Sequence, residues 1–317
     1  MRLDYAPGDS CPCGGGARAS ACCWKSAGVW LKDPSAILPR PPRSGYAHPK
    51  CYAQSTNDCS PKISKEHYIS RGLLALYGLN GLSLVAGLPH ISGQAFATRP
   101  TASLVANVLC ERHNNSLSPL DGEVRKLALA IGNYDADFNA PAPVSQIRVF
   151  SGEDVERWML KTVCGMVSSG QVAFGRVVES RQMAQVWVDV LYGACPWPEG
   201  WGLYFGGSDR MYHSSSFSFL PMSQPASGRV MAADLEINGM RFRLALGKPD
   251  DPARFGTFRP RSLIFEQDGV KKYIELSWQD QNLQQLALLS RTGIYQGPPP
   301  DWPQWARELS PPPDPAA

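Results

Sequence analysis

Apolar and polar residues in the second half of the chain follow two different periods. After Ser151, apolar side chains recur every three or four residues from Val155 to Met166, which is the spacing of one helix face. Asp154 stands three residues after Ser151, as in a capping box with Asp in place of Glu. The pattern predicts a helix that begins after Ser151 and buries its apolar stripe, with Cys164 as a small hydrophobic residue inside it.

Further along the chain, apolar and polar residues alternate with a period of two. Alternating segments flank Asn238-Gly239 and Asp268-Gly269, and these dipeptides favour the positive φ angles of tight hairpin turns. We therefore expect at least two antiparallel hairpins, with further strands at residues 203–205 and 217–219. Residues 183–192 have no clear period and are ambiguous between helix and strand.

These elements predict an α+β fold in which residues 146–296 form an α+β domain with an antiparallel sheet. The chain has 317 residues, of which 43% are hydrophobic, so it can bury a sizeable core but is long for one domain. Residues 33–49 are rich in Pro and typical of a linker of limited flexibility between an N-terminal module (1–32) and a central domain (50–145). Residues 297–317 form a Pro-rich tail that is not expected to build a packed core.

Three cysteines and one histidine of the central domain have the spacing of metal ligands. Cys51 and Cys59 are separated by seven residues, and Cys110 and His113 follow later with two residues between them. Three thiolates and one imidazole suit a tetrahedral structural zinc ion and leave no coordination position open for chemistry. The sequence therefore predicts a structural zinc site at these four residues.

Glu66, His67 and Asn114 stand beside these ligands. They supply a carboxylate, a base whose unperturbed pKa lies close to neutral pH, and an amide oxygen. Because hard divalent cations prefer oxygen ligands, these residues predict a second, catalytic metal ion, Mg²⁺ or Mn²⁺.

The arrangement of residues 51–121 resembles the HNH endonuclease family, whose ββα-metal finger carries an acidic-His pair at the end of a strand and closes with ligands on a helix. The resemblance implies that His67 is the general base that deprotonates water, and that Glu66 and Asn114 hold the metal against the scissile phosphate. It also implies that Cys110 and His113 anchor the helix.

Asn107 is the candidate for the middle Asn of that family, although it lies closer to Cys110 than the usual spacing. The chain departs from the family pattern at two further positions, because Ser70 replaces a common Pro and the final ligand is Asn114 rather than His. An insertion must separate the two halves of the motif. The helix-like residues 72–78 and the apolar residues 82–88 fall within it.

A second cysteine cluster lies near the N-terminus. Cys11, Cys13, Cys22 and Cys23 fall within thirteen residues, and glycines between them let the loop fold back. Four thiolates in so short a segment can enclose a metal ion that the segment needs in order to fold. The pattern resembles the SEC-C motif, a small zinc-binding module appended to many unrelated proteins. The resemblance implies a second structural zinc and a docking role, while a disulfide pair or redox thiols is the open alternative.

The cysteine count bears on the compartment. Of nine cysteines, four lie at the N-terminus, three in the central cluster, and Cys164 and Cys195 are unassigned. An odd number arranged as metal ligands, with no apolar targeting run at the start, predicts a reducing, cytoplasmic environment. No stretch approaches the ~18 consecutive apolar residues that span a bilayer, so no membrane partner is expected.

Charge is distributed unevenly. Residues 1–123 contain 12 Lys and Arg against 8 Asp and Glu, a net charge of +4, whereas the remaining residues contain 19 against 20, a net of −1. The basic bias of the half with the nuclease-like motif suits contact with phosphates, but it is too small to argue for nucleic-acid binding by itself.

The sequence thus predicts a metal-dependent HNH-type endonuclease that hydrolyses DNA, with a C-terminal domain that recognises a substrate, a protein partner or a signal. Analogy with nucleases that carry an appended domain suggests defence against foreign DNA. Two alternatives stay open. One is a zinc-stabilised adaptor that binds nucleic acid or protein without cutting, and the other is a nuclease acting on RNA, since the catalytic groups contact phosphate and not sugar.

Overall fold

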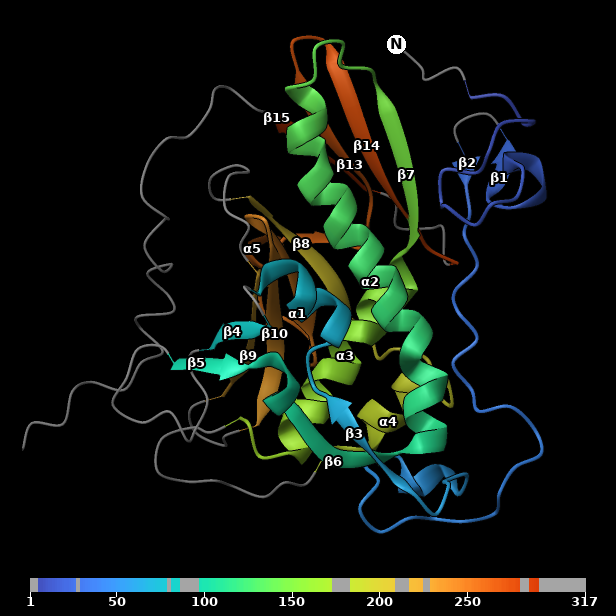
Figure 1. Ribbon diagram of the computed structural model, residues 1–317, viewed down its shortest axis with the longest axis vertical. Helices are drawn as coiled ribbons and strands as arrows, with labels where there is room; N and C mark the ends of the chain where they lie inside the picture. Colours follow the sequence, from blue (N-terminus) through green and yellow to red (C-terminus); the bar gives the residue numbers. More distant parts are fainter. Residues whose placement is uncertain are drawn as a thin grey trace, which may run out of the picture.

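The computed structural model describes residues 5–26, 29–78, 81–85, 97–172, 183–208, 217–224, 229–279 and 285–290. Within these ranges the chain has a mixed α+β fold, in which two long helices pack together and against two sheets (Figure 1). Part of the apolar segment 82–88 and all of the Pro-rich tail 297–317 lie outside the described residues.

The helices confirm the helical periodicity found in the sequence. The hydroxyl of Ser151 accepts the backbone N–H of Asp154 at 3.1 Å, so the predicted cap and the helix after it are confirmed. The helix-like residues 72–78 and the ambiguous residues 183–192 both contain helices. The α-helices in the described residues are α1 (Arg71–Tyr77), α2 (Glu111–Phe138), α3 (Gly152–Ser168), α4 (Gln185–Leu191) and α5 (Pro252–Phe255), and short 3-10 helices span Ala19–Ala21, Gln54–Thr56 and Thr101–Ser103.

The first sheet is antiparallel and has the strand order β12-β8-β11-β10-β9. Asn238 and Gly239, both at positive φ, form the turn between β10 and β11, so the first predicted hairpin is confirmed. The predicted strands at residues 203–205 and 217–219 lie in β8 and β9. The strands are β8 (Gly202–Ser208), β9 (Phe217–Ser223), β10 (Val230–Ile237), β11 (Met240–Ala245) and β12 (Thr257–Phe258).

The second sheet has the strand order β15-β13-β14-β7 and is mixed rather than antiparallel. Its strands are β7 (Gln146–Ser151), β13 (Pro260–Gln267), β14 (Val270–Ser277) and β15 (Gln285–Ser290). The predicted hairpin at Asp268-Gly269 joins β13 and β14, but β7 pairs with β14 in parallel and β15 pairs with β13 in parallel. The prediction of an antiparallel sheet is therefore wrong for this sheet, because the long connection through α3 and the first sheet returns the chain beside β7 in the same direction.

The central part of the chain contains a ββα unit. Strands β3 (Ile63–His67) and β6 (Val105–Cys110) pair antiparallel, and α2 begins at the residue after β6. A two-stranded ribbon of β4 (Leu82–Val85) and β5 (Ala97–Pro100) is inserted between β3 and β6 (Figure 1). The antiparallel register places Ile63, at the start of β3, beside Cys110 and the start of α2, and α2 then packs against β3.

Residues of the ranges 50–145 and 146–296 share one hydrophobic core. The same buried cluster contains Leu117 and Leu120 of α2, Trp158 and Met159 of α3, and Phe242 of the first sheet. Helices α2 and α3 pack against each other at the centre of this cluster. The boundary near residue 146 thus does not separate two cores, and independent folding of the two ranges stays a prediction.

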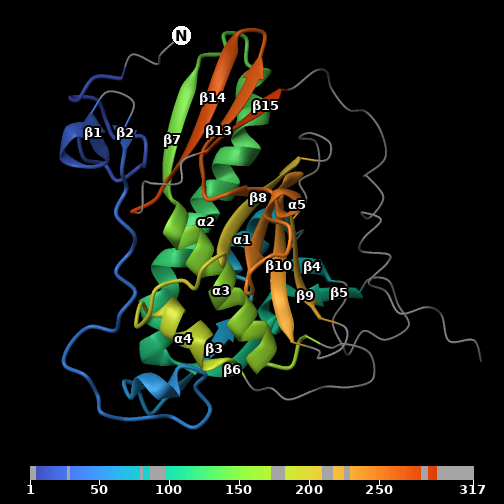
Figure 2. The same ribbon diagram turned by 180° about the vertical axis from the view of Figure 1, so that it is seen from behind.

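The N-terminal segment and the linker lie along the outside of this core. Strands β1 (Trp24–Ser26) and β2 (Val29–Trp30) lie beside β7 in both views (Figures 1 and 2). The linker is held at Ser35, whose N–H and hydroxyl donate to the carboxylate of Asp154 at 2.9 and 2.7 Å. Among the described residues, no helix combines the length and the apolar character needed to cross a membrane.

Candidate functional site

Cys51, Cys59, Cys110 and His113 converge where β6 passes into α2. All four are buried, and their ligand atoms lie within 4.8 Å of one another. The sulfur atoms of the three cysteines lie 3.6, 3.7 and 3.2 Å from Nδ1 of His113. The sequence-predicted ligands are therefore brought together as a group that can hold a structural metal ion.

The thiols of this group shift one another's pKa through their hydrogen bonds. The hydrogen bond with Cys51 lowers the pKa of the Cys110 thiol in spite of burial, whereas the hydrogen bond with Cys110 and burial raise the pKa of Cys51. Backbone N–H groups also point at the sulfurs, from Ser60 to Cys110 at 3.3 Å and from Cys110 to Cys51 at 3.4 Å. These contacts thus favour the thiolate of Cys110 and disfavour that of Cys51, and a bound cation would favour both thiolates.

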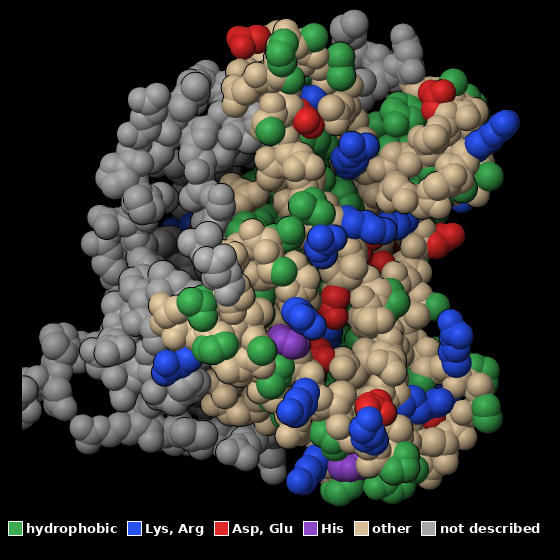
Figure 3. Space-filling model, viewed as in Figure 1, with side chains coloured by type: hydrophobic (Ala, Val, Ile, Leu, Met, Phe, Trp, Pro, Cys, Tyr) green, Lys and Arg blue, Asp and Glu red, His purple; other side chains and the backbone are tan. Residues whose placement is uncertain are grey.

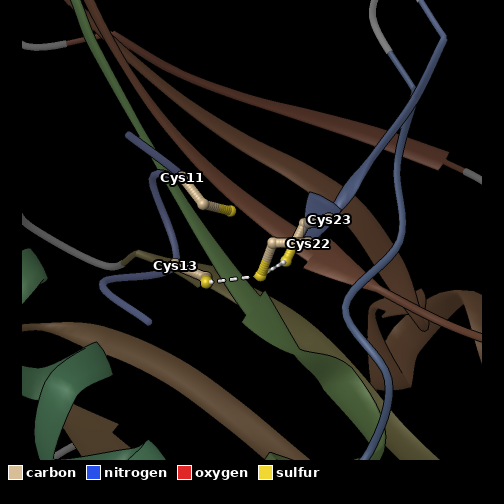
Figure 4. A group of neighbouring side chains, drawn as sticks. All are labelled: Cys11, Cys13, Cys22 and Cys23. Carbon is tan, nitrogen blue, oxygen red and sulfur yellow. Dashed lines mark hydrogen bonds between the residues drawn. The ribbon is translucent and has the colours of Figure 1, made fainter. Parts of the chain in front are cut away.

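The four N-terminal cysteines form a second group of the same kind (Figure 4). The Sγ atoms of Cys13 and Cys22 are 3.5 Å apart, and those of Cys22 and Cys23 are 3.6 Å apart. These separations are much longer than the S–S bond of about 2.05 Å, and all nine cysteines are free thiols. Burial is the main factor that raises the pKa of Cys22 to about 11. Cys11, Cys13, Cys22 and Cys23 can thus hold a second structural metal ion.

Glu66 and Asn114 meet beside the Cys51 group. Glu66 is buried near the end of β3, and its carboxylate forms a hydrogen bond with the side chain of Asn114 in the first turn of α2. Burial raises the pKa of Glu66, and the neighbouring Lys161 and Asn114 oppose this shift.

His67 is the last residue of β3 and is partly buried. Its ring forms a hydrogen bond with the backbone of Thr101, and Nε2 is buried and has no hydrogen-bond partner among the described residues. The bond therefore comes from Nδ1–H, which fixes the tautomer and leaves the basic lone pair on Nε2. Burial, followed by the charge of Arg71, lowers the pKa of His67, so its neutral form is favoured.

Strand register places the remaining candidate apart from these residues. Glu66 pairs with Ala106, and His67 pairs with Val105. The register shifts between the pairs of Ser64 and Glu66, so Asn107 lies at this irregularity of the ladder, where it is exposed. The structure thus brings Glu66 to Asn114 and leaves Asn107 exposed on β6.

Two residues of this site were missed in the sequence. The ammonium of Lys161 lies 2.8 Å from Oε1 of Glu66 and 2.7 Å from Oδ2 of Asp121, and Trp158 Nε1 donates to Asp121 at 3.0 Å. Asp121 follows Asn114 by seven residues, two helical turns, so helical spacing was an available signal for it. The signal for Lys161 was weaker. The sequence shows a charged residue three positions after Trp158 in a helix predicted to be buried, but it does not indicate which residues Lys161 contacts.

The surface around the ββα unit carries basic side chains. Lys65, Arg71, Arg125 and Lys126 are exposed on β3, α1 and α2. Figure 3 shows Lys and Arg side chains spread over this face of the molecule, with Asp and Glu between them. The face can therefore contact phosphates without being a strongly basic patch.

Known proteins give no direct guide to this site. Comparison with protein-family models, with curated proteins and with solved structures finds no match for the chain. The residues that bear on function are the two groups of ligands that can hold structural metal ions, together with the carboxylate of Glu66, the amide of Asn114 and the imidazole of His67.

Proposed function

We propose that the protein is a metal-dependent endonuclease of the HNH type that hydrolyses phosphodiester bonds in DNA. The observation that carries the proposal is the ββα unit, in which Glu66 of β3 lies close to Asn114, the residue after the ligand His113, and His67 follows Glu66 at the end of β3. Such a unit needs a structural metal to hold its short strands and helix start together. The neighbouring oxygen ligands and the base then have a rigid support.

Zinc is the structural metal that the distances support. Zn–S bonds of about 2.3 Å and Zn–N bonds of about 2.0–2.1 Å at tetrahedral angles put sulfur and nitrogen ligands about 3.6 Å apart, and two sulfurs about 3.8 Å apart. Around His113 the distances are 3.2 to 3.7 Å, and between the N-terminal sulfurs they are 3.5 and 3.6 Å. Thiolate-rich, closed sites of four ligands favour zinc over the harder divalent ions.

Glu66 and Asn114 would hold the catalytic Mg²⁺ or Mn²⁺. The carboxylate of Glu66 and the amide oxygen of Asn114 fit the preference of these ions for oxygen. A divalent ion bound there supplies positive charge against the phosphate and the leaving oxygen. His67 would take a proton from the attacking water at Nε2, for which it must be neutral, and its lowered pKa favours that form. Nε2 is buried, so this step requires that the site open to admit the water.

A zinc-stabilised adaptor without cleavage is the second candidate. The ion pair between Lys161 and Glu66 favours it, because an ammonium already compensates the charge of the proposed metal ligand. The exposed Lys65, Arg71, Arg125 and Lys126 would serve binding as well as cutting. DNA is chosen over RNA on the HNH resemblance, and the defence role comes from analogy with nucleases that carry an appended domain, so both remain proposals.

Cleavage of supercoiled plasmid tests the function. The full-length protein is assayed with Mg²⁺, with Mn²⁺ and with EDTA, and zinc content is measured after EDTA so that loss of structural zinc is recognised. His67→Ala should cut about 10² to 10⁴ times more slowly, with zinc content and melting temperature nearly unchanged. Its residual activity should rise with pH as hydroxide replaces the base. His48→Ala, a change at a partly exposed linker histidine, is the matched control and should cut like the wild type.

Asn114→Ala should fail differently, through weaker binding of the catalytic metal that higher Mg²⁺ or Mn²⁺ partly rescues. Equal cutting by His67→Ala and wild type would remove His67 from the mechanism and the HNH assignment with it. Cutting of RNA but not DNA would reassign the substrate. If the wild type binds nucleic acid but cuts none, the adaptor is the better description.

A further inference from the structure

A buried lysine from outside the ββα unit reaches the proposed ligand of the catalytic metal. Lys161 lies on α3, and its side chain is only 3% exposed. Its Nζ contacts Glu66 Oε1 at 2.8 Å and the two oxygens of Asp121 at 2.8 and 2.7 Å. One ammonium thus bridges a carboxylate of β3 and a carboxylate of α2.

The approach of α3 to β3 is fixed at a second point one helical turn away. Lys161 and Gly165 are four residues apart and share a face of α3. A Cβ on Gly165 would lie 3.3 Å from Cβ of Tyr68, the residue that follows His67. Because Gly165 has no side chain, the helix packs closely enough for Lys161 to reach Glu66.

Burial indicates which side of the carboxylate the ammonium occupies. Lys161 is almost fully enclosed, whereas the side chain of Asp121 is 29% exposed. The side chain of Glu66 is itself only 7% exposed, so a cation would reach it past the partly exposed Asp121 and Asn114, whereas Lys161 contacts it from inside the protein. It is therefore placed to orient the carboxylate and not to touch a substrate.

We propose that Lys161 is a positioning residue of the site, which holds the carboxylate of Glu66 in the orientation that presents it, together with Asn114, to a divalent cation. This inference rests on the proposed function, because it deepens the role of the same ligands. Partners that orient a ligating carboxylate typically contribute 10- to 100-fold to metal affinity. The site is then complete only when α3 is docked on the ββα unit, so residues 146–296 help to build it.

Direct binding of Mn²⁺ to the zinc-loaded, full-length protein tests this role without relying on cleavage. Electron paramagnetic resonance measures free Mn²⁺ in titrations of the wild type, Glu66→Gln, Lys161→Met and Glu156→Gln. Glu156→Gln is the matched control, because it breaks another buried ion pair of α3, to Arg259 at 3.1 Å, away from the site. The wild type and Glu156→Gln should bind an Mn²⁺ ion that Glu66→Gln loses, and Lys161→Met should bind it about 10- to 100-fold more weakly.

The outcomes separate this inference from the proposed nuclease activity. Unchanged Mn²⁺ affinity in Lys161→Met would make Lys161 merely structural, and tighter binding would make its ammonium a competitor of the cation; either result overturns the proposal. If Glu66→Gln binds Mn²⁺ as tightly as the wild type does, the proposed role of Lys161 is also overturned, even if the protein cuts plasmid. The expected binding pattern in a protein that cuts neither DNA nor RNA would support Lys161 as a positioning residue and defeat the nuclease.

A second variant covers the case in which Lys161→Met does not fold. The double change Lys161→Met with Asp121→Asn removes the ammonium together with its second carboxylate and keeps the net charge of the buried group. It is titrated and judged in the same way as Lys161→Met, against the single change Asp121→Asn.

Discussion

Oγ1 of Thr56 lies 2.9 Å from Nε2 of His113 and donates its own hydrogen to the carbonyl oxygen of Ala53 at 2.8 Å. Because that hydrogen is already used, Thr56 must accept the Nε2–H of His113. This contact fixes the tautomer in which Nδ1, the atom that faces the three cysteine sulfurs, carries the lone pair. A threonine that is not a ligand thus orients the only nitrogen ligand of the site.

The first prediction concerns this contact. Thr56→Val keeps the shape of the side chain but removes the acceptor, so zinc affinity at the Cys51 group should fall by about 10- to 100-fold. Competition with a chromophoric zinc chelator measures the change. Thr56→Ser retains the hydroxyl and should behave like the wild type. Equal affinities in the Val and Ser variants would show that the imidazole is oriented by other contacts.

The second prediction concerns the number of zinc ions. At four ligands per ion, the purified protein should contain about two zinc ions per chain. Cys110→Ser should lose one of them and destabilise the ββα unit, and Cys11→Ser should lose the other independently. Elemental analysis and thermal melting measure both effects. Cys195→Ser is the control, since Cys195 belongs to neither group, and a Cys110→Ser protein with full zinc content would contradict the assignment.

Local signals in the sequence were sufficient for some elements of the fold. Ser151 and Asp154 predicted a helix start because the cap involves residues three apart, and Asn238-Gly239 predicted a hairpin because the turn requires positive φ. The parallel pairing of β7 with β14 could not be predicted in this way. Its register joins Ile147 to Tyr273, and neither residue carries information about a partner so distant in the chain.

The same distinction applies to the candidate site. The cysteines and His113 were predictable because few other roles suit thiolates and imidazole at that spacing. Lys161 was not, because its effect depends on a buried contact with Glu66, which lies on a strand far from α3 in the sequence. A lysine in a helix is usually solvated, and only tertiary packing reveals that this one is enclosed.

The third prediction concerns pH and a lysine at the far end of the molecule. Lys272 of β14 is fully buried, its ammonium donates to the carbonyl of Val144, and it lies over the ring of Phe138. Burial lowers its pKa, with Asp137 opposing and Arg148 adding to the shift. Its contribution to stability is therefore most favourable above the unfolded pKa of about 10.5 and is lost as pH falls through the lower folded value.

Lys272→Met should accordingly melt at a higher temperature than the wild type at neutral pH, and the difference should shrink as pH rises toward 10.5. Thermal melts at a series of pH values measure it. Lys271→Met changes the adjacent, partly exposed lysine of the same strand and should shift the melting temperature little. If the difference in melting temperature between Lys272→Met and the wild type grows as pH rises, burial of the Lys272 ammonium does not destabilise the folded protein as proposed.

The fourth prediction concerns the N-terminal cysteines and strand β7, which is the end strand of the mixed sheet. Ile147 and Val149 pack into the buried group of Cys11, Cys23 and Trp30, while Phe150 points into the main core. The N-terminal module was expected to dock on another protein, but its apolar residues pack against β7 of the same chain. A covered strand also resists pairing with other molecules.

Loss of the N-terminal metal should expose this strand. Cys23→Ser removes one of the four ligands, so the module should unfold and uncover Ile147 and Val149. Hydrogen–deuterium exchange should then become faster in residues 146–151 than in the wild type, and the variant should aggregate more readily because an apolar strand at the end of a sheet is open to pairing. Cys195→Ser provides the comparison for a cysteine change outside both groups. If exchange in β7 stays unchanged while the N-terminal zinc is lost, the module covers β7 without its metal. That result would refute the predicted dependence of β7 protection on the metal.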